Sequence, residues 1–262
     1  MQKQQIPLCA DTIRQSSGVP TEIFSRVDST NTEAKRRITA GADGTFLIAA
    51  EEQTAGRGRQ GKAFFSPRGS GIYMTLTVFP NVPFTDAVSV TTKASVAVCR
   101  AIRRLTDKEP EIKWVNDILL DGKKICGILV EAVTAGKKPA LVIGVGMNVT
   151  ATEFPPELPD AGALNAELDR NELIAAITQE LLRELSDLKN ADYLEDYRAW
   201  SAVLGREVRY LKNGTAYSGK AVRIEADGGL CVELPNGRSE TLRSGEISLH
   251  LNQSFSVRET GQ

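Results

Sequence analysis

The stretch that decides the fold covers residues 111–133 and reads EIKWVNDILLDGKKICGILVEAV. Asp121-Gly122 divides it between two apolar runs, and such a dipeptide is the strongest short signal for a β-hairpin. We therefore predict two antiparallel strands, residues 111–120 and 123–133, that meet at this turn. An antiparallel pair in mid-chain favours an α+β fold over a regular alternation of parallel strands and helices.

The segments on either side of the hairpin supply the rest of a mixed sheet and its helices. Apolar or β-branched runs that stop at turn residues predict strands at residues 45–51, 71–79 and 140–149. N-cap residues and helical spacing predict helices at residues 32–40, 85–105, 173–188 and 191–200. We therefore expect an α+β domain in which helices flank a mixed sheet.

The sequence pattern of the chain changes after Gly205. Turn signals such as Asn236-Gly237 separate four short predicted strands, at residues 208–211, 217–225, 229–234 and 239–242, and these fit a small β-barrel. We divide the chain accordingly into a main domain at residues 25–203 and a C-terminal β domain at residues 204–262. Residues 1–24 precede both, and the sequence assigns them no role.

Composition limits the chemistry available to the chain. It has 262 residues, 41% of them hydrophobic, and 32 Lys and Arg balance 33 Asp and Glu. It lacks the global positive charge of a non-specific nucleic-acid binder, and without a signal segment or membrane span we expect it in the cytoplasm. His250 is the only histidine and the four cysteines lie far apart, which argues against histidine triads, zinc ribbons and disulfide frameworks.

Residues 56–61, Gly-Arg-Gly-Arg-Gln-Gly, form the clearest ligand-binding motif. Glycines allow a close backbone approach, and each guanidinium offers a fork of donors that matches phosphate or carboxylate oxygens. The segment also satisfies the dinucleotide-binding pattern G-x-G-x-x-G, but that pattern requires a helix directly after it. Residues 62–71 contain a proline and no helical period, so we interpret the motif as a phosphate-binding loop or, more simply, a solvated charged loop.

Three further segments place polar residues or glycines inside strands or at their ends. They are Lys113-Trp114-Val115-Asn116-Asp117, residues 123–131 with Lys124 and Gly127, and Gly144-Val145-Gly146-Met147-Asn148. An asparagine side chain can pair with the N6 and N7 edge of adenine. Each segment taken alone also fits a turn, a bulge or a solvated surface. Their joint occurrence with the Arg-Gly motif is what indicates a single site.

Together these motifs resemble those of the biotin protein ligases, the ligases that attach biotin to acetyl-CoA carboxylase. The resemblance runs from about Val27 to Asn148 through D-S-T-N, Q-T-A-G-R-G-R-Q-G, K-W-V-N-D, K-K-I-C-G-I-L-V-E and G-V-G-M-N. It implies that residues 25–203 form a catalytic biotin- and ATP-binding domain related in fold to class II aminoacyl-tRNA synthetases, and that residues 204–262 form an SH3-like barrel. It also implies a short form of the ligase, without the N-terminal DNA-binding domain that some members carry.

The resemblance implies a two-step reaction that uses ATP, biotin and Mg²⁺. Biotin and ATP first give biotinyl-5′-adenylate and pyrophosphate, and a lysine of a biotin carboxyl carrier domain then attacks the mixed anhydride. The expected partner is the carrier domain of acetyl-CoA carboxylase or of a related carboxylase, with no DNA and no membrane. The sequence leaves a monomer and a homodimer equally open.

The resemblance also implies roles for individual residues. The biotin site is expected to contain Ser29, Thr30, Asn31, Gln53, Gly56, Arg57, Lys124, Gly127 and Gly144, and the last two leave room for the valeryl chain. The nucleotide site is expected to contain Arg57, Arg59, Phe64, Asn116 and Asn148, with both asparagines at the adenine. Lys124 and Arg59 are expected to stabilise charge at the phosphate, and Asp117 to orient the incoming lysine or a metal. No set of metal ligands is assigned.

Three positions depart from the pattern of the family. Val115 stands where proline is usual, Gln60 where a third arginine is common, and Phe64 where tryptophan is common. We expect these differences to change ligand affinity modestly and to leave the reaction intact.

Three other functions compete with this interpretation. A lipoyl or octanoyl ligase shares the fold and the acyl-adenylate chemistry, and a biotin-binding module without activity would bind biotin but release no pyrophosphate. A biotin-dependent repressor needs a DNA-binding domain, and about 25 residues before the first motif are too few for a winged helix. We therefore predict a ligase that does not bind operator DNA.

Overall fold

The computed structural model describes residues 6–80, 87–135, 138–150, 153–212, 215–245 and 247–249. The helices are α1 (Ala10–Ser17), α2 (Thr30–Thr39), α3 (Ala87–Leu105), α4 (Arg170–Ser186) and α5 (Tyr193–Ala199). The strands of the main domain are β1 (Thr21–Phe24), β2 (Phe46–Ala50), β3 (Gly71–Val78), β4 (Glu111–Lys113), β5 (Asp117–Leu120), β6 (Lys123–Ala135) and β7 (Lys138–Asn148). The strands of the C-terminal part are β8 (Glu207–Lys212), β9 (Thr215–Ile224), β10 (Leu230–Glu233), β11 (Ser239–Leu242) and β12 (Ile247–Leu249).

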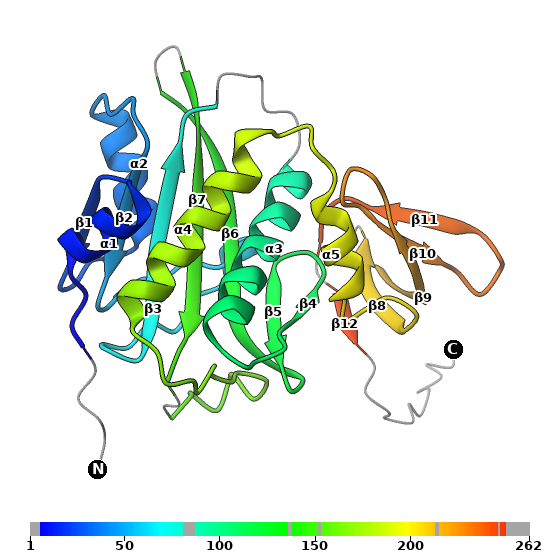
Figure 1. The fold of residues 1–262 in the computed structure, drawn as a ribbon. Coiled ribbons are helices and arrows are strands. Elements are labelled where there is room, and N and C mark those ends of the chain that lie inside the picture. Colours follow the sequence, from blue (N-terminus) through cyan, green and yellow to red (C-terminus); the bar gives the residue numbers. More distant parts are fainter. Residues whose placement is uncertain are drawn as a thin grey trace.

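The main domain is built on a seven-stranded mixed sheet in the order β1-β2-β3-β7-β6-β5-β4 (Figure 1). β1 runs parallel to β2, whereas the other neighbouring strands are antiparallel. This arrangement confirms the predicted α+β class and the mixed sheet flanked by helices. The hairpin at Asp121-Gly122 is also confirmed, because β5 and β6 pair on either side of it and both turn residues have positive φ.

One predicted strand is wrong in its extent. Residues 111–120 form two short antiparallel strands, β4 and β5, because the chain reverses at Trp114 and Val115, whose peptide bond is cis. Asn116 lies at the end of this reversal, directly before β5. Its side chain donates to Ile128 O at 3.0 Å while its own carbonyl accepts from Ile128 N at 3.0 Å. These bonds extend the pairing of β5 with β6 by one residue, so the reversal that separates β4 from β5 falls at residues 114–116.

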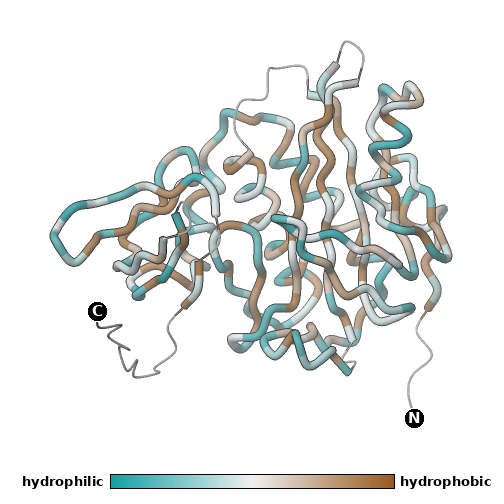
Figure 2. The backbone as a smooth tube through the Cα atoms, turned by 180° about the vertical axis from the view of Figure 1, so that it is seen from behind, coloured by the Kyte–Doolittle hydropathy of each residue, from teal (hydrophilic) through white to brown (hydrophobic). Residues whose placement is uncertain are grey.

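The two faces of the sheet carry different layers. Helix α2 covers one face, where Ala34 and Ile38 pack with Ile48 and Val142. Helices α3 and α4 cover the other face and bury the alternate strand residues, such as Leu141. The central strands appear as brown apolar segments when the molecule is seen from behind (Figure 2). Successive residues of a strand point to opposite faces, so a sheet covered on both faces requires apolar residues at successive positions.

The N-terminal segment joins the same sheet. Helix α1 packs against α4, and β1 adds a parallel edge strand beside β2. Neither element was predicted, because α1 buries a single residue, Ile13, and β1 has only four residues. Elements this short show little periodicity.

The C-terminal part is a five-stranded antiparallel sheet in the order β11-β10-β9-β8-β12. Four of its strands were predicted from the turn signals, and β12 was not. Helix α5 lies beside this sheet (Figure 1), and Arg198 donates to Ile224 O at 3.0 Å. Trp114 Nε1 also donates to Gly228 O at 2.9 Å. The turn between β4 and β5 is therefore fixed to the C-terminal sheet.

Candidate functional site

A cavity of about 490 Å³ lies on the α2 face of the sheet. Among the side chains and glycines that line it are nearly all of the predicted site residues: Ser29, Thr30, Asn31, Gln53, Arg57, Arg59, Phe64, Asn116, Asp117, Lys124, Gly127, Gly144 and Asn148. Gly56 is not in this lining, but its carbonyl accepts from Phe64 N at 2.9 Å and so shapes the loop that covers the cavity. Residues more than a hundred positions apart thus converge as the sequence predicted.

One end of the cavity is a buried polar network at the start of α2. Thr30 donates from its backbone N–H at 2.8 Å and from its hydroxyl at 3.1 Å to Gln53 Oε1, and Gln53 Nε2 donates to Ser66 Oγ at 3.0 Å. The single hydroxyl proton of Thr75 reaches Asn31 Oδ1 at 2.6 Å or Thr30 Oγ1 at 2.8 Å. A network of this kind presents donors and acceptors in fixed directions, as recognition of a polar heterocycle requires.

The Arg-Gly loop folds back on itself over the cavity. Arg57 and Ala63 form an antiparallel bridge, and Gly58 N donates to Lys62 O at 2.7 Å. At the tip, Arg59 Nη1 donates to Asn116 Oδ1 at 3.0 Å. This contact joins the loop to the β4–β5 turn, and both Arg57 and Arg59 belong to the cavity wall.

Lys124 and Asp117 form an ion pair on the neighbouring strands β6 and β5, with 2.7 Å between Nζ and Oδ1. The carboxylate therefore fixes the position of the ammonium group at the cavity. Exposure of 39% for the Lys124 side chain leaves the ammonium open to a ligand. Beside it, a methyl group on Gly127 would lie 3.4 Å from Lys124 Nζ and 3.5 Å from the Phe64 ring.

Two glycines of β7 make room for other side chains of the protein. A methyl group on Gly144 would lie 2.2 Å from Asn31 Oδ1, and one on Gly146 would lie 2.7 Å from the Phe64 ring. Asn31 therefore fills the space over Gly144. The resemblance implied instead that this space is open for the valeryl chain of biotin. Phe64 rests on the floor of the cavity in this state.

The two asparagines assigned to adenine already have protein partners. Asn116 accepts from Arg59 and donates to Ile128 O, and Asn148 Nδ2 donates to Gly162 O at 2.9 Å. Bidentate pairing of Asn116 with a base would require both of its bonds to be replaced, and Asn148 would have to reorient or share its amide. Both side chains nevertheless line the cavity.

Sequence reasoning missed an acidic group next to the network at α2. Glu131 on β6 accepts from Asn31 Nδ2 at 3.0 Å and from Lys35 Nζ at 2.8 Å. Burial acts to raise the pKa of Glu131, but these two hydrogen bonds and the charges of Lys35 and Arg57 outweigh it and hold the pKa below its usual value. Glu131 is therefore an anion at neutral pH and fixes the orientation of the Asn31 amide.

Thr75 and Gly146 were also missed. Thr75 is a fully buried hydroxyl in β3, as is Thr77, and these two threonines among apolar residues were the signal available in the sequence. Gly146 belongs to the quoted G-V-G-M-N motif, yet only the structure shows that the Phe64 ring needs its space.

No group of three or more His, Cys, Asp or Glu side chains converges in the described part of the chain. Carboxylates do reach the cavity singly, from Asp117, Glu157 and Asp160. His250 lies outside the described residues. None of the described helices has the length and apolar character that crossing a bilayer requires.

Comparison of the sequence with protein families matches residues 23–148 to the biotin/lipoate A/B protein ligase family and residues 203–250 to the biotin protein ligase C-terminal domain. The chain is 34% identical over 244 residues to a biotin–[acetyl-CoA-carboxylase] ligase of Mycobacterium tuberculosis, covering 88% of each chain. It is 31% identical over 251 residues to the bifunctional ligase/repressor BirA of Bacillus subtilis, covering 88% of this chain and 77% of the relative.

Solved structures give the same result. A biotin protein ligase from Aquifex aeolicus in complex with biotin and ATP superposes with a TM-score of 0.73 at 26% identity, covering 88% of this chain and 98% of the other. A biotin protein ligase from Leishmania major in complex with biotinyl-5-AMP superposes with a TM-score of 0.60 at 27% identity, covering 86% and 98%.

Proposed function

Because the chain belongs to the biotin protein ligase family, we propose that it activates biotin with ATP to biotinyl-5′-AMP and transfers biotin to a lysine of a biotin carboxyl carrier domain. The observation that carries this proposal is the convergence of Arg59, Lys124 and the Thr30–Gln53 network on one cavity. These groups supply cations for a phosphate and fixed polar contacts for a ureido ring.

In the first step a carboxylate oxygen of biotin attacks the α-phosphorus of ATP, and the bond from that phosphorus to the pyrophosphate oxygen breaks. Negative charge gathers on the phosphoryl oxygens during this displacement. Arg59 and Lys124 come from separate elements, the loop and β6, and both reach the cavity wall. Cations held in place at the start of the reaction stabilise the transition state without reorganisation. In this role the Asp117 carboxylate holds Lys124 in position.

In the second step the neutral ε-amine of the carrier lysine attacks the acyl carbon, AMP leaves with the electron pair of the broken C–O bond, and the nitrogen loses one proton to the departing AMP or to solvent. Water would hydrolyse the same mixed anhydride, so the site must exclude it. We assign the Arg-Gly loop to cover the adenylate, and Phe64 must leave the space over Gly146 to close over it as well. Asn116 accepts a hydrogen bond from Arg59 at the tip of that loop, so loss or formation of this bond would indicate movement of the loop.

Biotin recognition is assigned to the network at the start of α2. The ureido ring has one carbonyl acceptor and two N–H donors, and Ser29, Thr30 and Gln53 offer hydroxyl and amide groups at this end of the cavity. Ser29 makes no capping bond to helix α2. A site that hydrogen-bonds a buried polar ring discriminates against ligands that lack it by roughly 10⁴.

Mg²⁺ fits this site as a companion of ATP. Magnesium in nucleotide sites is held by one or two carboxylates together with phosphate oxygens, so single carboxylates such as Asp117 or Asp160 suffice. The metal would neutralise phosphate charge when bound.

The remaining assignments belong to the same proposal. The carrier is that of acetyl-CoA carboxylase or a related carboxylase, the enzyme acts in the cytoplasm, and it binds no operator DNA. We also assign residues 25–203, together with β1, which joins their sheet, to a catalytic domain related to class II aminoacyl-tRNA synthetases, and the C-terminal sheet to an SH3-like barrel. A salt-sensitive shift of operator DNA at nanomolar protein would contradict the prediction about DNA.

The test offers the chain a carrier domain with ATP, Mg²⁺ and either biotin or lipoate. We expect pyrophosphate release and a mass increase of the carrier with biotin. Transfer of lipoate alone would make the chain a lipoyl ligase, and biotin binding without pyrophosphate release would make it a binding module.

A further inference from the structure

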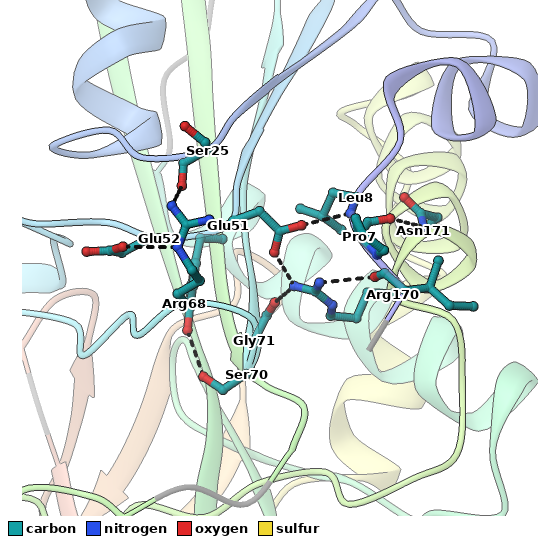
Figure 3. Close-up of polar contacts among 12 residues, drawn as sticks. Pro7, Leu8, Ser25, Glu51, Glu52, Arg68, Ser70, Gly71, Arg170 and Asn171 are labelled. Atoms are coloured by element: carbon teal, nitrogen blue, oxygen red, sulfur yellow. Dashed lines mark hydrogen bonds and ion pairs between the residues drawn. The ribbon is translucent and has the colours of Figure 1, made fainter. Parts of the chain in front are cut away.

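The base of the Arg-Gly loop is held by a buried arginine from a distant helix. Glu51 follows β2 directly, Gly71 opens β3, and residues 52–70 form the connection between them. Arg170 Nη1, from the first turn of α4, donates to Glu51 Oε2 at 2.9 Å and to Gly71 O at 3.1 Å (Figure 3). The two hydrogens of one nitrogen thus connect both stems of the loop.

The N-terminal segment completes this arrangement. Leu8 N donates to the other Glu51 oxygen at 2.8 Å, and Arg170 Nη2 donates to Ile6 O at 3.2 Å (Figure 3). Asn171, next on α4, donates to Pro7 O at 3.1 Å. Both carboxylate oxygens of Glu51 are therefore used, and the segment before α1 packs against the stems of the loop.

The ion pair between Arg170 and Glu51 is largely buried, and the burial of two charges costs free energy. The Arg170 side chain is 4% exposed and that of Glu51 is 14% exposed. Arg170 Nε is buried and has no hydrogen-bond partner among the described residues. Desolvating two charges offsets most of their attraction, so such a pair contributes more to a defined geometry than to stability.

The geometry that it defines belongs to the cavity. Gln53 lies two residues after Glu51 and connects Thr30 to Ser66, so a shift of the first stem moves this bridge. A loop whose stems are fixed also loses less conformational entropy when its tip orders on a ligand. We propose that Arg170 and Glu51 form a stem clasp that positions the Arg-Gly loop for biotin and its adenylate, and that they are positioning residues outside the site.

The adjacent glutamate provides a matched control. Glu52 lies on the same stem but pairs at the surface with Arg26 at 3.2 Å and Arg68 at 3.5 Å, and both arginine side chains are more than half exposed. Exposed pairs of this kind contribute little. Glu52→Gln should therefore change neither loop position nor ligand binding, whereas Glu51→Gln changes both.

The experiment uses the full chain and compares wild type, Glu51→Gln, Glu52→Gln and the double variant Glu51→Leu with Arg170→Met. The double variant removes both charges together, which proteins often tolerate without loss of stability. Each variant is measured for melting temperature, for the KM of biotin and kcat of pyrophosphate release, and for the rate at which preformed biotinyl-adenylate dissociates.

We expect Glu51→Gln and the double variant to raise the biotin KM and the dissociation rate of the adenylate about tenfold, with kcat at saturating biotin changed much less. Glu52→Gln should stay within about twofold of wild type. A folded double variant with wild-type KM and wild-type dissociation would overturn the clasp. Loss of folding in both Glu51 variants would overturn it too, because the pair would then serve the fold alone.

This inference rests on the proposed function, and the activity of the wild-type chain distinguishes a failure of the one from a failure of the other. A wild-type chain that releases no pyrophosphate with biotin contradicts the proposed function. An active wild type with unaffected variants contradicts only the clasp.

Discussion

Strand β7 has two faces that serve different purposes with one backbone. Toward α3 and α4 it presents Leu141, Ile143, Val145 and Met147, all buried in the main core. Toward α2 the same strand carries Val142, Gly144, Gly146 and Asn148, and the last three line the cavity. Side chains alternate along a strand, so the core and the site are interleaved residue by residue.

The difference shows how a sheet can hold a cavity without losing stability. Gly127 pairs with Gly146 in adjacent strands, and the space over Gly144 and Gly146 accommodates Asn31 and Phe64, which help to line the cavity. The opposite face of these strands stays filled. Substitutions on the two faces should therefore have separable effects, on ligand binding in one case and on stability in the other.

The largest effect is expected at the cavity face of β6. Lys124→Ala should slow pyrophosphate release by roughly 10²–10³, because it removes a cation aimed at developing charge. The half-exposed side chain adds little to folding, so the melting temperature should stay close to that of wild type.

Lys123 is the matched control for this prediction. It precedes Lys124, is exposed, and donates to Pro159 O at 2.9 Å. Lys123→Ala should leave pyrophosphate release within about twofold of wild type. Equal rates for wild type and Lys124→Ala in a single-turnover assay would remove Lys124 from the mechanism.

A methyl group on the floor of the cavity should weaken biotin binding next most strongly. Gly144→Ala places its Cβ 2.2 Å from Asn31 Oδ1, so the Asn31 amide must leave its contact with Thr75. We expect a biotin KM about 10-fold to 100-fold higher, equivalent to about 1.4–2.8 kcal/mol. Steady-state kinetics at saturating ATP measures this, and an unchanged KM would separate Asn31 from biotin recognition.

The adjacent residue on the other face should behave in the opposite way. Ile143→Val removes one methylene from a fully buried side chain in the core. It should lower the free energy of unfolding by about 0.5–1.5 kcal/mol and leave the biotin KM unchanged. Urea denaturation and kinetics on one preparation check both halves. A raised KM in this variant would show that the two faces are not independent.

The smallest effect is a pH dependence at Glu131. Since its pKa is held below the usual value in the folded chain, its stabilising contribution is present above the usual pKa and is lost as pH falls through the lowered one. Glu131→Gln should therefore cost about 1 kcal/mol at pH 7 and progressively less below pH 4. Denaturation curves of both proteins between pH 7 and pH 3 test this, and a difference independent of pH would exclude the charge as its cause.

Much of the fold was predictable because its central elements are long. β6 and β7 carry extended apolar runs, and a hairpin turn of known type separates β5 from β6. The break between β4 and β5 was missed, since no glycine or proline marks it and a turn was only one of the interpretations that residues 113–117 allowed. β12 was missed for the same reason as α1 and β1, because three residues carry no measurable period.

The residues that form the site were easier to predict than the contacts between them. Glycine-rich and polar segments at strand ends mark Arg59, Asn116 and Lys124 whatever the register of the sheet. The partners of these residues depend on register and on side-chain packing. Asn31 of α2 packs over Gly144 of β7, and the register of β6 on β7 places Glu131 within reach of it. A single sequence does not specify that register.

The central claim is tested most directly by a crystal structure of the chain with biotinyl-5′-AMP bound. We expect the adenylate in the cavity beside Gly127 and Gly146, where it displaces the Phe64 ring, with Arg59 and Lys124 within hydrogen-bond distance of the phosphate or the acyl oxygens. Density for the ligand at another site, or both cations directed into solvent while the ligand occupies the cavity, would contradict it.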